Sequence, residues 1–375
     1  MAYDSPNYVT ALFHLPFDLA FFALKAILYI LPAVRPVRQW SHRQAIRVAL
    51  LSLITKYVSL LKAAPTLSLK PGREKDRFVV VEPAPAKCYD GPADSSTVRP
   101  KPIGLTWTPK PPGPQSEDDQ SAVVLHFHGG AYVLFTGRDE DTGFASRTLT
   151  RHLGSAFVCT PQYRLSSHKN GHFPAALQDA ITAYHHLVKK LHISSSRIIL
   201  SGDSAGGHLA LALARYLESH GAAHNLHMPA AVTLWSPWVD VDDALRNTVE
   251  SKRRYATDYL CTSFSQWGSK AVTNNGAIDP ASPYISPLHH PFRVTGRQVA
   301  LFVQVGESEV LLDDGILLAK RFTDAGWPVR LNVSPNSPHD ILMFGKTLGF
   351  AKEVQDAAKA AKDFLLESTN LRLRA

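Results

Sequence analysis

Six short apolar runs alternate with stretches of helical spacing in the part of the chain that follows residue 121. The runs lie at 122–127, 156–160, 197–200, 231–234, 299–305 and 329–333, and the helical stretches lie near 139–153, 174–191, 205–219, 313–325 and 350–367. Apolar strands that alternate with helices are typical of a parallel sheet covered by helices on both faces. Because ligands of such sheets bind beyond the carboxyl ends of the strands, we expect functional side chains at that edge.

Two segments depart from this alternation. Residues 65–114 contain eleven prolines, too many for a helix, and favour short antiparallel strands at 77–81 and 103–107, followed by a solvated acidic loop at 115–120. Residues 241–297 carry Trp267 and several prolines and break the alternation of strand and helix. We interpret residues 241–297 as an insertion that covers the sheet.

The first 64 residues have a pattern of their own. Residues 11–31 form an apolar block that contains Asp18 and Lys25, and polar residues recur every three to five positions across 45–61, as in an amphipathic helix. Each charge costs about 2.5–3.5 kcal/mol at the centre of a bilayer, which disfavours a transmembrane span. A basic flank favours lipid headgroups, and it consists of Arg35, Arg38, Arg43 and Arg47.

Three roles stay open for residues 1–64. They lie on a membrane surface, they anchor the chain, or they cap the main domain formed by residues 65–375. If the apolar block spans a membrane, the arginine-rich side and the rest of the chain lie in the cytosol. We expect an intracellular protein, located at the endoplasmic reticulum or another membrane if these residues bind lipid and in the cytoplasm if they do not.

The composition narrows the choice of partner. The chain has 375 residues, of which 45% are hydrophobic, and its formal net charge is +8. It has no basic stripe interleaved with aromatic residues, so we expect no nucleic-acid partner. Three scattered cysteines, Cys88, Cys159 and Cys261, are too few for a disulfide framework or a zinc site. We expect buried free thiols and no bound metal.

The stretch from Gly202 to Gly207 is the strongest chemical signal. It reads Gly-Asp-Ser-Ala-Gly-Gly, follows a strand-like run and precedes a stretch of strong helix formers. This context matches the Gly-x-Ser-x-Gly nucleophile elbow, a tight strand-to-helix turn that projects the serine hydroxyl and needs glycine on both sides. Ser204 is therefore the predicted nucleophile. The alternative is a glycine-rich helix N-terminus capped by a serine.

A serine nucleophile needs a base and amide donors for the oxyanion. Residues 128–130 end the first regular strand, and we expect the amides of Gly129 and Gly130, with that of Ala205, to be the donors. His339 follows the last strand and comes after the serine in the expected order, so it is the predicted base. His208, one turn into the helix after the elbow, is expected to be a packed residue.

The acid that orients the base is expected in residues 306–314, the loop after the run at 299–305. Glu309 lies where this loop leaves the carboxyl edge of the sheet, and we predict that it is the acid. Asp313 lies about one turn into the following helix, where its charge is explained by the helix dipole. Asp313 and Glu307 remain alternatives.

Six motifs taken together resemble the hormone-sensitive lipase family of α/β-hydrolases over about residues 121–365. They are His128-Gly129-Gly130, Tyr163-Arg164-Leu165, Phe173 to Asp179, Gly202 to Gly207, Ser236-Pro237-Trp238 and Ser286-Pro287-Leu288. The resemblance implies an α/β-hydrolase fold: a mostly parallel eight-stranded sheet with helices on both faces and a helical cap made from the N-terminal segment and residues 241–297. It also implies hydrolysis of small-molecule carboxylic esters without a cofactor.

Two residues depart from the family pattern. Glu309 stands where an aspartate is usual, which makes the acid one methylene longer, and His208 stands where an asparagine is usual. The N-terminal segment is longer than in compact members. It is similar to that of membrane-associated eukaryotic deacetylases, including fungal sterol deacetylases.

The expected chemistry is cleavage of an apolar ester through an acyl-enzyme, in which His339 takes the Ser204 proton and Glu309 orients the imidazole. The residues expected to shape the substrate pocket are Trp238, Trp267 and Tyr132. An acyltransferase of secondary metabolism would use the same catalytic residues but exclude water. A small-molecule receptor similar to the gibberellin receptors would lack the histidine, and a purely structural membrane protein would need none of these residues.

Overall fold

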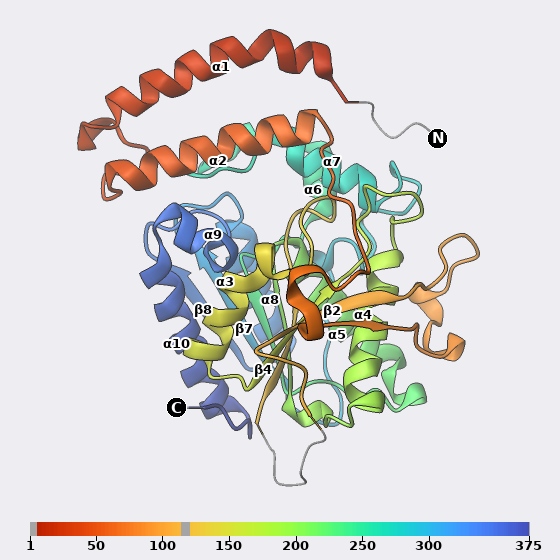
Figure 1. Cartoon of the computed structure of the whole chain (residues 1–375). Coiled ribbons are helices and arrows are strands. Elements are labelled where there is room, and N and C mark those ends of the chain that lie inside the picture. The colour runs from red at the N-terminus through yellow and green to blue at the C-terminus, as the bar shows by residue number, and fades with distance from the viewer. Residues whose placement is uncertain (1–5, 114–120, 375) are drawn as a thin grey trace.

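Helices cover one end of an α/β domain, and the C-terminus lies at the opposite end (Figure 1). The computed structural model describes residues 6–113 and 121–374. The acidic loop expected at 115–120 lies outside these residues.

One eight-stranded sheet forms the centre of the domain. Its strands are β1 (Phe78–Val81), β2 (Ile103–Thr108), β3 (Val123–Phe127), β4 (Phe157–Gln162), β5 (Ile198–Asp203), β6 (Ala231–Trp235), β7 (Ala300–Gly306) and β8 (Val329–Ser334). They lie in the order β1-β2-β4-β3-β5-β6-β7-β8. β2 is antiparallel to β1 and β4, and the other neighbours are parallel. The predicted fold class is therefore confirmed.

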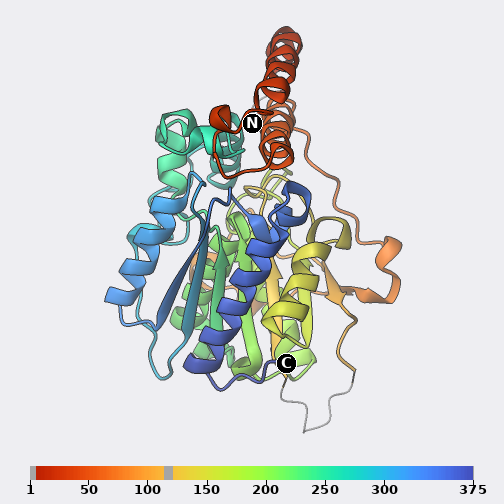
Figure 2. The ribbon, with the colours of Figure 1, turned by 90° about the vertical axis from the view of Figure 1, so that its left-hand side faces the viewer.

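Helices cover both faces of the sheet. They are α3 (Asp139–Thr148), α4 (Ala175–His185), α5 (Ala205–His220), α8 (Leu312–Asp324), α9 (Ile341–Leu348) and α10 (Ala351–Ser368). Figure 2 shows α3 and α10 in front of the sheet and α4 and α5 behind it. Strands β3, β5, β6 and β7 are buried along their whole length, as expected for continuous apolar runs between two helical layers. Helix α9 was not predicted, because its eight residues directly follow the loop of His339.

The insertion at 241–297 contains two helices, α6 (Val241–Arg246) and α7 (Thr262–Val272), joined by short turns. Both lie above the sheet in Figure 1, where α7 packs against α2 (His42–Leu60) and α6 packs against α7. The hydroxyls of Ser59 in α2 and Ser263 in α7 are 2.6 Å apart. The insertion and the N-terminal segment are thus in direct contact above the sheet.

Helix α1 (Tyr8–Leu28) lies across the outer side of α2 (Figure 1). Its less exposed residues recur at helical spacing, at Ala11, Leu15, Asp18 and Phe22. The Asp18 carboxylate accepts hydrogen bonds from Lys56 Nζ at 2.6 Å and from the Tyr57 hydroxyl at 2.7 Å. One of the two charges in the apolar block is therefore compensated by α2, and its side chain is only 25% exposed.

The segment between the two N-terminal helices is attached to the main domain. Trp40 is 1% exposed, and its Nε1 donates to the carbonyl of Asn336 at 2.6 Å. A capping box formed by Ser41 and Gln44 begins α2, three residues earlier than the predicted start. Arg35 donates to three carbonyls at the end of α1 and at Trp40, so it ends the helix and does not belong to an exposed basic flank.

All three cysteines, Cys88, Cys159 and Cys261, are buried free thiols, as predicted. Within residues 6–113 and 121–374, no group of histidine, cysteine or acidic side chains is placed to hold a metal ion.

Candidate active site

Ser204 lies at the turn between β5 and α5. Its backbone has φ 49° and ψ −118°, a strained conformation for a residue with a side chain. A Cβ on Gly202 would overlap the carbonyl oxygen of Gly206, and a Cβ on Gly206 would overlap that of Phe127. Glycine is needed at both positions because backbone closes on each side of the turn, as the elbow motif predicts. The turn places the hydroxyl at the carboxyl edge of the sheet.

His339 follows β8 and lies next to Ser204. Its Nε2 is 3.0 Å from the Ser204 Oγ, and the residue is 1% exposed. Burial by itself lowers the pKa of the imidazole, but the carboxylates of Glu309, Asp258 and Asp203 raise it by more, so the pKa lies above its ordinary value. The surrounding negative charge therefore favours transfer of the serine proton to this ring.

Glu309 is fully buried in the loop between β7 and α8. Its Oε2 accepts hydrogen bonds from Ser236 Oγ at 2.5 Å and from the Gly306 amide at 3.0 Å. The same oxygen is 3.8 Å from His339 Nδ1, which is too long for a hydrogen bond, so the carboxylate acts on the imidazole through its charge in this conformation. Contacts between catalytic side chains are often long in the absence of substrate and shorten to hydrogen bonds when substrate binds.

The two alternative acids lie elsewhere. Asp313 is 74% exposed on α8 and pairs with Arg254 at 3.0 Å. Glu307 accepts a hydrogen bond from the amide of Asn336 at 2.8 Å. Of the three candidates, the structure brings Glu309 to the imidazole.

Asp258 is a buried acid that the sequence pattern does not single out. Its Oδ1 accepts hydrogen bonds from the amides of Tyr259 at 2.8 Å and His339 at 3.2 Å, and its Oδ2 accepts one from Val310 at 2.8 Å. Burial raises its pKa to about 6, while the positive charge of His339 lowers it. Asp258 thus connects the cap to the loops that carry His339 and Glu309. No local signal marks it, because its partners are 52 and 81 residues away along the chain.

The structure corrects one predicted oxyanion donor. The amide of Gly129 donates to Asp203 Oδ2 at 2.7 Å and is therefore not available. Asp203 is held in turn by His126 Nε2, 3.0 Å from its other oxygen. The amides of Gly130, Ala131 and Ala205 donate to no acceptor in the described part of the chain. The available pair in this turn is thus Gly130 and Ala131, one residue further along than predicted.

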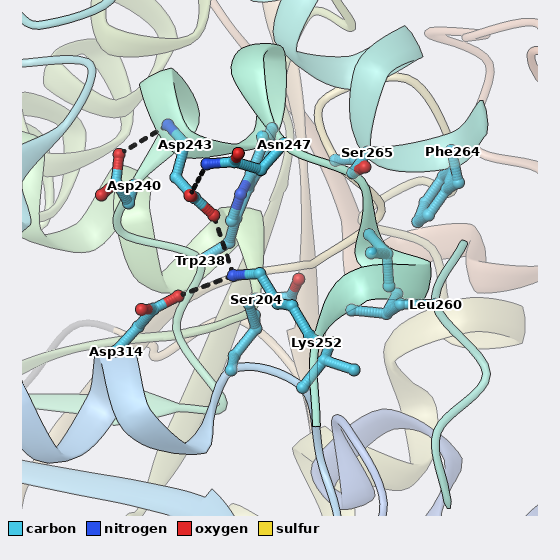
Figure 3. A pocket seen from close by; sticks show the side chains of 15 residues that line it. Ser204, Trp238, Asp240, Asp243, Asn247, Lys252, Leu260, Phe264, Ser265 and Asp314 are labelled. Carbon is cyan, nitrogen blue, oxygen red and sulfur yellow. Dashed lines mark hydrogen bonds and ion pairs between the residues drawn. The ribbon is translucent and has the colours of Figure 1, made fainter. Parts of the chain in front are cut away.

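Ser204 lies at the junction of two cavities of unequal size. The large cavity, about 340 Å³, runs under α2 and has His339 in its wall. The small cavity, about 40 Å³, lies under α6 and is drawn in Figure 3. Gly130 lines the large cavity and Ala131 lines the small one. Apolar residues make up most of the large wall, including Leu51, Ile54, Val58, Leu134, Phe135, Tyr259 and Phe344.

The structure places the three predicted wall residues differently. Trp238 lines the small cavity next to Ser204 (Figure 3). Tyr132 lines neither cavity, because its hydroxyl is bonded to Nδ1 of His208 at 2.5 Å. Trp267 lines neither cavity either, and its ring packs under the Lys62 ammonium, 5.1 Å from the ring centre. His208 is a packed residue, as predicted, and burial lowers its pKa to about 4.

Comparisons with known proteins agree with this geometry. A family model described as the alpha/beta hydrolase fold matches residues 124–343. An acetyl-hydrolase of Streptomyces hygroscopicus is 33% identical over 217 residues, covering 58% of this chain and 67% of that protein. An ethyl acetate hydrolase of Pseudomonas putida is 29% identical over 239 residues, covering 62% and 70%. The crystal structure of a hormone-sensitive lipase from a metagenome library has a TM-score of 0.56 and 28% identity, covering 71% of this chain and 82% of that one.

Proposed function

We propose that this chain, which belongs to the α/β-hydrolase family and is a carboxylic ester hydrolase of the hormone-sensitive lipase type, acts on one kind of ester. The proposed reaction removes a short acyl group from a bulky apolar alcohol. The observation that carries the proposal is the 3.0 Å contact between Ser204 Oγ and His339 Nε2 at the junction of two unequal cavities.

The reaction is acyl transfer to water through an acyl-enzyme. Ser204 Oγ attacks the ester carbonyl while His339 Nε2 takes its proton, and the amides of Gly130, Ala131 and Ala205 hold the oxyanion. The ester C–O bond then breaks, and His339 returns the proton to the leaving oxygen, which departs as the free alcohol. Water attacks the acyl-Ser204 while His339 takes its proton. The bond between the acyl carbon and Ser204 Oγ then breaks, His339 returns the proton to Oγ, and the carboxylic acid leaves.

Glu309 is the proposed triad acid. It is the buried carboxylate nearest to Nδ1 among the three candidates, and Ser236 and Gly306 fix the oxygen that faces the ring. Its negative charge stabilises the imidazolium that forms when His339 accepts the serine proton. The extra methylene relative to aspartate is compatible with this role, because Ser236 and Gly306 hold the same oxygen that lies 3.8 Å from Nδ1.

The position of His339 supports one assignment of the two halves of the ester to the two cavities. The imidazole must reach the leaving oxygen to protonate it, so the alcohol lies on the His339 side. The large cavity contains His339 in its wall and the small one does not. The alcohol therefore occupies the large cavity and the acyl group occupies the small one.

The cavity volumes support a short acyl group and a bulky alcohol. A volume of about 40 Å³ corresponds to roughly three water-sized positions, enough for an acetyl to butyryl chain. The large cavity, at about 340 Å³, falls in the usual range for ligand pockets, and its walls are mostly apolar. The acetyl-hydrolase and ethyl acetate hydrolase among the relatives are named for acetyl substrates, which agrees with a short acyl group.

We further propose that residues 1–64 combine two of the roles that the sequence leaves open. Helix α2 contributes to the cap, since it lines the large cavity. Helix α1 is long and apolar enough to cross a membrane, yet its Asp18 is paired with Lys56 of α2, so we propose that α1 lies along the surface of an anionic membrane. Its outer face is apolar and exposed, for example at Val9 (80%) and Phe13 (67%).

Two ester series test the proposed activity. One holds p-nitrophenol constant and lengthens the acyl chain from acetate to palmitate, and the other holds acetate constant and enlarges the alcohol from ethanol to a sterol. We expect kcat/KM to fall with acyl length and to rise with the size of the alcohol. Absence of turnover on every ester, or transfer of the acyl group to an added alcohol in preference to water, would contradict the proposal.

A further inference from the structure

A charged group closes the small cavity on one side. Lys252, in the turn after α6, places its ammonium 2.9 Å from Asp243 Oδ2 and 3.6 Å from Asp314 Oδ2. Asp243 belongs to α6 in the cap, and Asp314 belongs to the first turn of α8 in the main domain. Figure 3 shows the ammonium between the two carboxylates, with Leu260 and Phe264 on the other side of the cavity.

This arrangement is fixed by more than the two ion pairs. The other oxygen of Asp243 accepts a hydrogen bond from Asn247 Nδ2 at 2.6 Å, and its amide donates to Asp240 Oδ1 at 2.9 Å. The side chains of Lys252, Asp243 and Asp314 are 26%, 28% and 23% exposed, so each stays partly open to water, although burial raises the pKa of Asp314 to about 6. The small cavity thus has apolar walls near Ser204 and a hydrated ionic wall beyond them.

We propose that Lys252, held by Asp243 and Asp314, is the residue that limits acyl-chain length. This inference rests on the proposed function, because it requires the acyl group to occupy the small cavity. A chain that fills the cavity and grows further must press methylenes against the ionic wall and displace the water that solvates it. Desolvation of an ion costs several kcal/mol, whereas each buried methylene contributes only about 0.8 kcal/mol, so the longer chain is excluded.

The ionic wall also joins the cap to the main domain, so a test must separate chain selection from cap attachment. The chain offers a matched pair for this purpose. Arg254 lies two residues after Lys252, and Asp313 directly precedes Asp314. Arg254 and Asp313 form an ion pair at 3.0 Å, which also joins the insertion to α8. Neither Arg254 nor Asp313 lines the small cavity.

The experiment compares kcat/KM for p-nitrophenyl acetate, butyrate, hexanoate and octanoate. Lys252→Met removes the charge and shortens the side chain by one atom, and Asp314→Leu replaces one carboxylate with an apolar group of similar size. We expect each to raise the hexanoate-to-acetate ratio at least about tenfold, since one methylene in a matched apolar pocket changes kcat/KM by that order. Arg254→Met and Asp313→Leu should keep the wild-type ratio.

The outcomes separate the two proposals. Measurable acetate cleavage that is lost in Ser204→Ala supports the proposed function whatever the chain-length ratio shows. An unchanged ratio in folded Lys252→Met and Asp314→Leu overturns the inference, and so does an equal rise in Arg254→Met, which would assign the effect to a loosened cap. The inference would also be overturned if Lys252→Met and Asp314→Leu changed the preference for the size of the alcohol at constant acetate and left the preference for acyl length unchanged. That result would place the alcohol in the small cavity.

Discussion

The carboxyl edge of the sheet and helix α1 lie at the same end of the molecule, but they are held in very different ways. At the sheet edge Ser204, Glu309 and His339 are 8%, 0% and 1% exposed. Glu309 accepts hydrogen bonds from Ser236 and Gly306, the His339 amide donates to the Asp258 carboxylate, and the Ser204 Oγ lies 3.0 Å from the His339 ring. On α1 the large apolar side chains other than Leu15 and Phe22 are 43% to 80% exposed. Ester hydrolysis should therefore be sensitive to the loss of single atoms at the sheet edge, whereas membrane binding by α1 should depend on its exposed apolar face as a whole.

Removal of the nucleophile tests the buried side of this comparison most strongly. We expect Ser204→Ala to reduce kcat by about 10⁶-fold, the order found when a serine nucleophile is removed from a comparable triad. The fold should persist, because the substitution removes one hydroxyl and no packing. Stopped-assay release of acid from p-nitrophenyl acetate, with circular dichroism as the folding control, measures both, and retained turnover would disprove the serine mechanism.

Substitution of the triad acid should have the next largest effect. Glu309→Gln should reduce kcat by about 10⁴-fold, as expected when the orienting acid loses its charge. The acid limb of the pH profile should also move. His339 must be neutral to act as base, so activity rises with pH through its pKa, and loss of the Glu309 charge lowers that pKa and shifts the limb to lower pH. A limb that stays in place would exclude Glu309 as the acid.

Substitution of Asp258 tests whether residues 241–297 help to position His339 at the carboxyl edge of the sheet. Asp258→Asn turns an amide group toward the backbone donors of His339 or Val310 and removes one charged hydrogen bond, worth about 1.5–3 kcal/mol. If that energy positions His339 in the transition state, kcat falls by roughly 10- to 100-fold with little change in KM. A change in melting temperature without a change in kcat would make Asp258 a structural residue only.

Helix α1 should respond to changes across its surface and not to single atoms. Phe13→Glu combined with Phe17→Glu, at positions 67% and 66% exposed, should release the full-length protein from anionic liposomes in a pelleting assay. Turnover of p-nitrophenyl acetate in solution should stay within a few-fold of wild type. Leu366→Glu on α10, at a position 47% exposed, is the matched control and should leave liposome binding unchanged. Equal binding by all three proteins would refute the membrane proposal.

The smallest effect is expected at Asp313. It is 74% exposed and pairs with Arg254 on the surface, where ion pairs contribute about 0–1 kcal/mol. Asp313→Asn should therefore leave kcat and kcat/KM at wild-type values in the ester assay. A large loss of turnover in this variant would mean that Asp313, and not Glu309, serves His339.

The elements of the fold follow from local features of the sequence. Buried strands require continuous apolar runs, and the elbow requires glycines where the backbone packs against the turn. Strand β5 and the position of Ser204 can therefore be predicted from the sequence alone. The residues that were missed depend on distant partners. The amide of Gly129 is occupied by Asp203, 74 residues away, and Asp258 serves two loops that the sequence places far from it.

The predicted pocket walls show the same limit. A tryptophan or tyrosine near a site is easily recognised in a sequence, but its direction depends on the rotation of its element and on its neighbours. Tyr132 turns to His208 and Trp267 packs under Lys62, whereas Trp238 faces the small cavity. Residue type alone does not distinguish these three positions.

The contact between Trp40 and Asn336 has a consequence for synthesis. These residues are 296 positions apart, and Trp40 Nε1 donates directly to a carbonyl in the loop that leads to His339. At about 5–20 residues per second, a ribosome needs roughly 15–60 s to pass from one to the other. Throughout that interval the nascent helix α2 lacks α9, one of the elements that it packs against in the folded chain, so part of its apolar face stays open to a bilayer or a chaperone until the catalytic loop has been translated.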